Sequence, residues 1–441
     1  MNNNRLTGRD FVLGVQHLFA MFGATVLVPA LTGLSVSATL LFAGLGTLLF
    51  HLITGRKVPA FLGSSFAFLG GYFAIKALCD AQGVSNFSAY AGVGVACAGM
   101  VYVILAILFK CFGANRVMRY FPPIVTGPII ISIGLTLSET AITNCTDNWI
   151  IALAAIITVI VCNIWGKGMV KIVPILLGVI VSYLVAVCMG KVDFTPVAEA
   201  KWIGFPVAFN DTVFSLFKDG DASIIITSII TIVPIAIATI IEHIGDISAI
   251  SSTVGKNFIA EPGLHRTLLG DGLATSMAAL FGAPANTTYG ENTGVLALTK
   301  VYDPRVIRLA AIFAVILSLS PKFAAIIQVM PVATMGGISL ILYGMISAVG
   351  VRNVVENHVD LSKSRNIIIA ALILVLAIGI KFGTGDAQAI VFNIGQAAIS
   401  LSGLAVSAII GILLNAVLPG KDYVFETDDA DKAKTGVDFK V

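Results

Sequence analysis

Charge is scarce in this 441-residue chain, because only 12% of its residues are Asp, Glu, Lys or Arg, whereas soluble domains carry about 25%. The six cysteines form no CxxC pair and no metal-like spacing, which argues against a disulfide framework and a metal site. The chain also lacks HExxH, GxSxG and Walker-type patterns. Nothing in the sequence therefore supports an enzyme, a bound cofactor or a nucleic-acid partner.

Apolar residues dominate the composition, since 57% of the chain is hydrophobic. Apolar stretches recur from Phe11 to Leu418, and a helix needs about 20 such residues to cross a bilayer. The first stretch follows Arg5 and Arg9 but continues through Pro29, so we expect a retained span rather than a cleaved signal peptide. The composition predicts an all-α polytopic protein surrounded by membrane lipid.

The hydropathy pattern predicts twelve plain spans and two broken ones. Segments 58–78 and 283–300 are each apolar in one half and rich in Gly, Ser, Thr, Asn or Pro in the other, so neither is expected to be one continuous helix. Counting both gives fourteen transmembrane segments. The plain spans are expected at 11–31, 36–54, 89–109, 121–140, 149–165, 171–190, 224–250, 266–282, 304–320, 330–350, 366–382 and 397–418.

The distribution of basic residues supports fourteen crossings. With a cytoplasmic N-terminus, only six of the 27 Lys and Arg residues fall outside, which agrees with the positive-inside rule. Leaving out one broken segment would reverse every later loop and place Arg305, Arg308, Arg352 and Arg365 outside. We therefore expect both termini to be cytoplasmic.

The two halves of the chain show a weak sequence similarity to each other. Residues 44–47 (Gly-Leu-Gly-Thr) precede the first broken segment, and residues 272–275 (Gly-Leu-Ala-Thr) precede the second. Phe-Pro at 121–122 and Met-Pro at 330–331 follow in the same order. Seven spans per half give opposite orientations, so the pattern predicts an inverted repeat. The expected parts are a cytoplasmic N-terminus 1–10, a first repeat 11–190, an extracellular linker 191–223, a second repeat 224–418 and a cytoplasmic tail 419–441.

The broken segments indicate where a site lies. Unpaired backbone groups are tolerated at membrane depth only inside protein or beside a polar cavity. Pro59 to Phe68 and Pro284 to Asn292 each suggest an extended stretch that turns into a half-helix. The free N–H groups of such a helix start can hold a carbonyl oxygen. The alternative is a purely structural re-entrant loop.

Three ionisable residues interrupt the apolar span 224–250. Glu242 and Asp246 are four residues apart on one helix face, which makes them a candidate proton-relay pair. His243 lies about 100° round the helix and is assigned either to the relay or to a structural hydrogen bond. For Glu242 the simpler alternative is a hydrogen bond between helices.

Glu291 follows the Tyr289-Gly290 turn at the start of the second half-helix. Together with Glu242 it would suit a flat ligand with two N–H donors and two carbonyl groups, such as uracil. Phe66, Tyr289 and Tyr343 could supply an aromatic face, although each could equally be a packing residue. Lower-ranked polar candidates are Gln16, His17, Asp271, which could instead cap its helix, and Ser339 beside Tyr343.

Residues 291–300 (Glu-Asn-Thr-Gly-Val-Leu-Ala-Leu-Thr-Lys) resemble the signature of the nucleobase–ascorbate transporter family. Residues 16–25, 63–68 and 286–291 resemble its bacterial uracil-transporting branch in particular. The resemblance runs from about Phe11 to Lys421.

This resemblance implies a core domain from spans 1–4 and 8–11 and a gate domain from spans 5–7 and 12–14. Short strands in spans 3 and 10 would meet at the substrate, with Glu242 and Glu291 holding the uracil ring. Backbone N–H groups near Phe66 and Gly290 would meet its carbonyls, and Tyr289 and Tyr343 would line the pocket. The resemblance further implies a homodimer in the bacterial inner membrane, with a proton as the coupling ion.

Two positions depart from the uracil-transporting pattern. Asp246 stands where those proteins commonly have His, and Asp271 is also similar to the purine-transporting branch. Glu291 argues the other way, because purine transporters usually have Gln there. The sequence thus favours proton-coupled uracil uptake involving Glu242, Asp246, His243 and Asp271. The alternatives are a xanthine or urate symporter and, less favoured, a transporter of sulfate-like anions.

Overall fold

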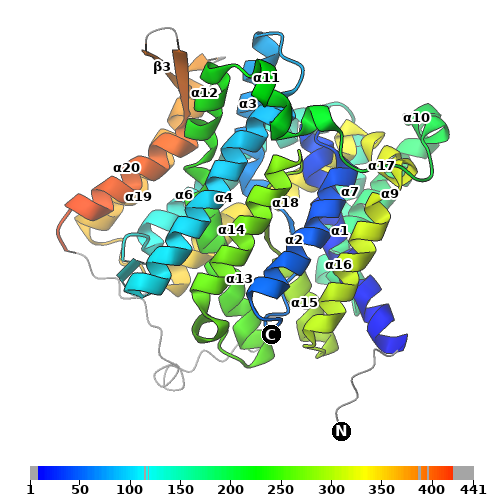
Figure 1. The fold of residues 1–441 in the computed structure, drawn as a ribbon, viewed down its shortest axis with the longest axis horizontal. Coiled ribbons are helices and arrows are strands. Elements are labelled where there is room, and N and C mark those ends of the chain that lie inside the picture. Colours follow the sequence, from blue (N-terminus) through cyan, green and yellow to red (C-terminus); the bar gives the residue numbers. More distant parts are fainter. Residues whose placement is uncertain (1–7, 114–115, 118, 386–388, 395–396, 421–441) are drawn as a thin grey trace.

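The computed structural model describes residues 8–113, 116–117, 119–385, 389–394 and 397–420. Most of them are helical, and the longer helices run between two ends of the molecule (Figure 1). Within this described part, seven helical segments are long and apolar enough to cross a bilayer. α16 and α17 meet the same criterion only as a pair, with a bend of 86° between them. The prediction of a multi-pass, mostly helical membrane protein is confirmed.

Each of the twelve segments predicted as plain spans contains a helix. The seven longer segments are α1 (Gly8–Thr32), α2 (Val36–Ile53), α4 (Phe87–Phe112), α6 (Pro123–Thr146), α12 with α13 (Ala222–Ile232 and Ile235–Val254), α18 (Val332–Glu356) and α19 (Ser364–Gly383). The shorter helices are α7 (Trp149–Ile164), α9 (Pro174–Cys188), α14 (Leu264–Leu280), α16 (Pro304–Ser318) and α20 (Gly403–Val417).

One predicted span needs correction, and another contains a break. The span 224–250 is confirmed as one helical segment, which is broken between α12 and α13, where Pro234 lacks the N–H that would continue the helix. The span 397–418 is wrong in its first third, because β4 (Ala397–Ser402) is extended and pairs with β3 (Ala389–Ile394). Ser402 caps the first turn of α20 by accepting from the Ala405 N–H, so the helix begins only at Gly403.

The two broken segments have the predicted order of strand and then helix. In the first, β1 (Leu62–Ser64) is followed by η1 (Phe66–Phe68) and α3 (Leu69–Ala81). In the second, β2 (Asn286–Thr288) is followed by α15 (Gly290–Thr299). The strands pair antiparallel, with Gly63 opposite Thr287, and both are fully buried. Two segments more than two hundred residues apart therefore share one short sheet inside the protein.

Helices pack in close pairs around this sheet. α14 lies along α4, α16 along α2, and α6 along α18, while α7 contacts α9 and α19 contacts α20. Small residues permit the close approach. A Cβ on Gly99 would lie 2.2 Å from the Ser276 hydroxyl, and one on Gly134 would lie 2.1 Å from the Tyr343 carbonyl oxygen. Larger residues at these positions would push the paired helices apart.

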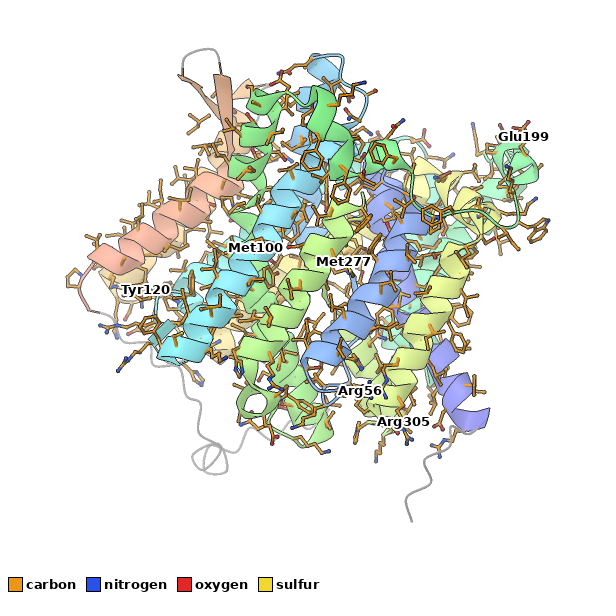
Figure 2. All side chains as sticks on the ribbon, viewed as in Figure 1. Arg56, Met100, Tyr120, Glu199, Met277 and Arg305 are labelled. Atoms are coloured by element: carbon orange, nitrogen blue, oxygen red, sulfur yellow. The ribbon has the colours of Figure 1, made fainter. Side chains whose placement is uncertain are left out.

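Short elements gather at one end of the molecule (Figure 1). The linker between α9 and α12 contains α10 (Thr195–Glu199), η2 (Phe209–Asp211), η3 (Val213–Ser215) and α11 (Leu216–Asp219). The same end carries α17 (Pro321–Gln328) and the β3–β4 hairpin. In Figure 2, Glu199 lies at this end, whereas Arg56 and Arg305 lie at the opposite end. Two further short helices are α8 (Met169–Ile172) and the π-helical turn η4 (Ile259–Gly263).

Candidate functional site

Hydrogen bonds from neighbouring helices fix the two strands in place. Thr47 of α2 accepts from the Leu62 N–H at 2.9 Å, and Thr275 of α14 donates to the Asn286 carbonyl at 2.7 Å. The Asn286 side-chain amide donates to the Phe42 carbonyl at 2.8 Å. Buried backbone groups must find partners, and here threonines of two helices provide them. The strand ends are therefore held rigidly at the centre of the helix bundle.

Tyr289 links the two strand segments through its hydroxyl. It donates to the Ser64 carbonyl at 2.7 Å, and the Thr25 hydroxyl donates to it at 3.3 Å. Its ring packs against Gly63, where an added Cβ would lie 2.6 Å from the ring. The backbone of Tyr289 also extends the ladder, since its N–H donates to the Phe61 carbonyl at 3.0 Å. Tyr289 is buried, and α1, β1 and β2 meet around it.

The ionisable residues of α13 lie directly beside β2. His243 Nδ1 is 2.8 Å from Asp271 Oδ2 on α14, and both side chains are completely buried. The Thr288 hydroxyl donates to Asp246 Oδ2 at 3.0 Å and lies 3.4 Å from His243 Nδ1. A polar chain thus runs from Asp246 through Thr288 and His243 to Asp271. Three of the four predicted proton-coupling residues belong to it.

Asp271 does not cap its helix, so that alternative is wrong. The helix α14 begins at Leu264, two turns before Asp271, and Gly263 occupies the N-cap position. Asp271 therefore lies in the helix interior, where it faces His243.

One face of α13 remains open. Glu242, Gly245, Asp246, Ala249 and Ser252 recur at helical spacing, and each keeps accessible surface. A Cβ added at Gly245 would meet no atom within 4 Å. By contrast, α13 residues nearer its N-terminus, among them Ala238, Thr239 and Ile240, are buried. The accessible space beside the two carboxylates therefore extends toward the C-terminal end of α13.

The other predicted site residues are either only partly described or not joined to the ionisable residues of α13. Gly290 and Glu291 form the first turn of α15, but their side chains lie outside the described part of the structure. Phe66 is half-buried at the start of η1. Ser339 and Tyr343 are buried one turn apart on α18, which packs on α6. Among the described residues, we find no hydrogen bond between these two side chains and the ionisable residues of α13.

Sequence reasoning missed several polar partners. Thr288 was not singled out, although it bridges Asp246 and His243. Tyr72 of α3 was also missed, and its hydroxyl accepts from the Ala285 N–H at 2.8 Å. The Asn292 amide contacts both the ring and the carbonyl of His17, each at 3.2 Å. The unbroken polar run from Asn286 to Tyr289 was the available signal. In the part of the chain that the structure describes, no cluster of three His, Cys, Asp or Glu residues suited to a metal is found.

Comparisons with known proteins identify relatives of this chain. A family model described as "Permease family" (Xan_ur_permease) matches residues 8–385. The uracil permease of Bacillus caldolyticus is 41% identical over 437 residues, which cover 96% of both chains. The uracil permease of Bacillus subtilis is 39% identical and covers 92% of this chain and 91% of its own.

Solved structures resemble the fold at lower identity. The transmembrane domain of the cyanobacterial bicarbonate transporter BicA superposes with a TM-score of 0.59 at 15% identity. The match covers 93% of this chain and 97% of that domain. At this identity the likeness concerns the fold alone.

Proposed function

Because the chain belongs to the permease family whose model covers residues 8–385, we propose that it imports uracil together with a proton by alternating access. One observation carries the choice of substrate: a uracil permease is 41% identical to this chain over 96% of both lengths. The structure adds a buried sheet with two helix starts beside it and carboxyl groups on the facing helix. These are the groups that a small heterocycle requires.

The chemistry of uracil matches this arrangement group by group. Its two ring N–H groups need acceptors, which Glu242 and Glu291 would provide, and its carbonyls need donors. The backbone N–H groups at the starts of η1 and α15 are such donors, and the helix dipoles strengthen them. Phe66 would offer an apolar ring surface beside the first of these starts. In this proposal Tyr289 holds the two strands together, and its ring lies against Gly63.

Proton coupling would use the polar chain beside β2. Glu242 and Asp246 are one turn apart, so a proton shared between them removes like-charge repulsion in a low-dielectric surrounding. Thr288 connects Asp246 to the His243–Asp271 pair through short contacts. Binding a proton together with uracil would let the site cross the membrane with less net charge. Uptake should therefore increase when the external solution is acidic.

The exposure pattern of α13 supports an inward-facing state. Accessible surface runs from Glu242 to Ser252, toward the loop that also contains η4. That end of the molecule carries Arg56 and Arg305 (Figure 2). Basic residues concentrate on the cytoplasmic side of membrane proteins. This end would therefore face the cytoplasm, with both termini on the same side and the α10–α17 end outside.

Helix packing supports fourteen spans in two inverted halves. Exchanging the halves maps α2 onto α14 and α4 onto α16, so the α4–α14 contact becomes the α16–α2 contact, and both occur. The same exchange converts the α7–α9 contact into the α19–α20 contact, and the α6–α18 and β1–β2 pairs map onto themselves. Such agreement is expected of an inverted repeat.

The contacts also divide into two groups. α1, α2, α4, α14 and α16 pack mainly among themselves, as do α6, α7, α9, α18, α19 and α20. This grouping supports the proposed core and gate domains, which would move against each other during transport. Family resemblance further favours a homodimer in a bacterial inner membrane. Native mass spectrometry of the purified protein in detergent would test the dimer.

Xanthine or urate uptake is the second candidate. Asp246 and Asp271 favour it, because they match the purine-transporting branch. Both residues lie in the polar chain beside β2. The two candidates share the scaffold and differ only in the ligand.

Uptake into proteoliposomes tests the proposal. Purified protein would be reconstituted, and radiolabelled uracil would be offered at acidic external pH, with unlabelled uracil, xanthine and urate as competitors. We expect competition by uracil alone and a lower rate when a protonophore collapses the gradient. Competition by xanthine or urate would shift the substrate to purines. An unchanged rate without a proton gradient would refute the coupling.

A further inference from the structure

Three apolar side chains that are close in sequence in the linker between α9 and α12 are largely exposed, as are Phe209 and Phe217 further along it. Trp202, Ile203 and Phe205 are 74%, 80% and 84% exposed. They do not belong to a spanning helix, so the exposure of lipid-facing helix residues does not account for them. Contiguous exposed apolar groups indicate an interaction surface. We name residues 201–205 the linker strap.

The linker strap is fixed to the junction between α16 and α17. The Gly204 N–H donates to the Leu319 carbonyl at 2.9 Å, and the Lys322 N–H donates to the Lys201 carbonyl at 3.0 Å. A Cβ on Gly204 would lie 2.6 Å from the Pro321 ring, so only glycine fits this approach. The strap therefore lies at the same level along the membrane normal as the α16–α17 junction and does not move as a free loop.

The orientation of α17 defines that level. It is bent by 86° from α16, and α16 packs along α2, which is itself long and apolar enough to cross a bilayer. A helix perpendicular to a spanning helix at its end lies in the membrane plane. Its inner face is covered, because Ala324 and Ala325 are buried and the Phe323 ring lies 5.3 Å from the Phe22 ring. Ile326 on the other side is exposed.

The side chains of this surface match the interfacial region of a bilayer. Lys322 Nζ lies 5.0 Å from the centre of the Trp202 ring, and the neighbouring Lys201 is exposed. Tryptophan is enriched at the level of the lipid headgroups, with its ring among the upper acyl carbons. Lysine ammonium groups there pair with lipid phosphates while their stems cover apolar surface.

We propose that the linker strap and α17 form a membrane-surface anchor, with Trp202, Ile203 and Phe205 inserted among the phospholipids of the leaflet at the α10 and α17 end. Lys201 and Lys322 meet the phosphates of the same lipids. α17 also contacts α9, where the Tyr183 hydroxyl donates to the Ile326 carbonyl at 3.2 Å. The lipid surface thus holds the region where α9, the linker and the α16–α17 junction meet. This inference does not depend on the identity of the transported solute.

Tryptophan fluorescence in vesicles tests the anchor. The chain has three tryptophans, so Trp149→Phe with Trp165→Phe leaves Trp202 alone. The full-length variant would be reconstituted into phosphatidylcholine vesicles whose acyl chains are brominated near the glycerol or near the methyl end. We expect stronger quenching by bromine near the glycerol and weak quenching by aqueous acrylamide.

A matched control places a tryptophan elsewhere in the same linker. Glu199→Trp, combined with Trp202→Phe in the same background, puts the ring on the exposed side of α10. This ring should be quenched by acrylamide and not by brominated lipid. If Trp202 behaves in the same way, the strap lies in water and the proposal is wrong.

Protection of Trp202 from both quenchers would also overturn the proposal, because a second protein copy would then cover the strap. If the double variant does not fold, the difference between the unmodified protein and Trp202→Phe gives the same signal. That comparison needs no other substitution.

Discussion

The two strand–helix units of this protein share a backbone plan but differ in chemistry. The first unit, β1 with η1 and α3, is held by neutral groups such as Thr47 and Ser64. The second, β2 with α15, lies against the ionisable residues of α13 and contacts Asp246 directly through Thr288. The strands pair residue for residue, so the strand backbones do not distinguish the units, and only the first has a 3-10 turn, η1, between strand and helix.

This difference suggests a division of labour. The first unit provides a fixed edge of backbone donors and acceptors, and no buried ion pair is found among its described residues. The second unit is coupled to the buried His243–Asp271 pair. Protonation of this pair would therefore affect β2 and α15 first. It would reach β1 through the hydrogen bonds between the two strands. Substitutions on the two sides should separate effects on transport from effects on stability.

The largest expected effect is that of Asp271→Leu. Removing one member of a fully buried pair leaves His243 without its partner, which typically costs about 3–5 kcal/mol. We expect a large fall in the thermal unfolding temperature of the detergent-purified protein and loss of uptake.

The double variant Asp271→Leu with His243→Phe distinguishes structure from coupling. Replacing both partners by apolar groups usually restores stability, so the unfolding temperature should recover. Uptake should remain lost if the pair takes part in proton coupling. Recovery of proton-driven uptake would show that the pair is structural.

Glu242→Gln should act on transport rather than on stability. A hydrogen bond to a charged group contributes about 1.5–3 kcal/mol, so we expect uracil uptake to fall about 10- to 100-fold. Glu139→Gln is the matched control, because Glu139 lies on α6 and is paired with Lys381 at 3.4 Å. The control should transport normally. Equal uptake by both variants would mean that Glu242 does not bind the substrate.

Thr288→Val, compared with Thr287→Val, tests the two faces of β2 separately. It removes the hydroxyl that donates to Asp246, and we expect uptake at saturating proton gradient to fall by roughly tenfold, equivalent to about 1.4 kcal/mol. Thr287→Val is the control, since its buried hydroxyl has no hydrogen-bond partner among the described residues. The pH profile of uptake should shift only in Thr288→Val. Similar profiles for both would mean that Asp246 does not depend on β2.

Tyr289→Phe weakens the link between the units. The variant loses the donor to the Ser64 carbonyl and the acceptor for the Thr25 hydroxyl, and each such hydrogen bond contributes about 1 kcal/mol. A modest fall in unfolding temperature is expected, while the half-saturating uracil concentration should change little. A large loss of uracil affinity with unchanged stability would assign Tyr289 to the ligand instead.

Much of this arrangement was predictable from the sequence. The helix in each plain span follows from hydropathy, and the strands in both broken segments follow from polar runs next to Pro59 and Pro284. Glu242, His243 and Asp246 were found because ionisable residues are rare and costly in spans.

Pairing over long distances was not predictable in the same way. The partner of His243 is on another helix, and Thr288 is a neutral residue whose role depends on what lies opposite it. The β3–β4 hairpin was missed because its residues are as apolar as a helix of similar length, and hydropathy does not distinguish the two. The interior position of Asp271 was missed because the start of α14 depends on the unusual turn η4.

The smallest expected effect concerns the loop before the first unit. Lys57 pairs there with Glu261 of η4, and both side chains are at least half exposed, unlike the buried pair beside the second unit. The hydrogen bond from Lys57, and then its charge, lower the pKa of Glu261 below its usual value of 4.5. A lowered pKa in the folded protein adds stability above the unfolded-state pKa, and this is lost as the pH falls through the folded value. Glu261→Gln has no such contribution to lose, so its slightly lower unfolding temperature should converge with that of the unmodified protein as the pH falls below 4.5 and through the lowered pKa of Glu261. Parallel curves would show that this exposed pair does not stabilise the fold.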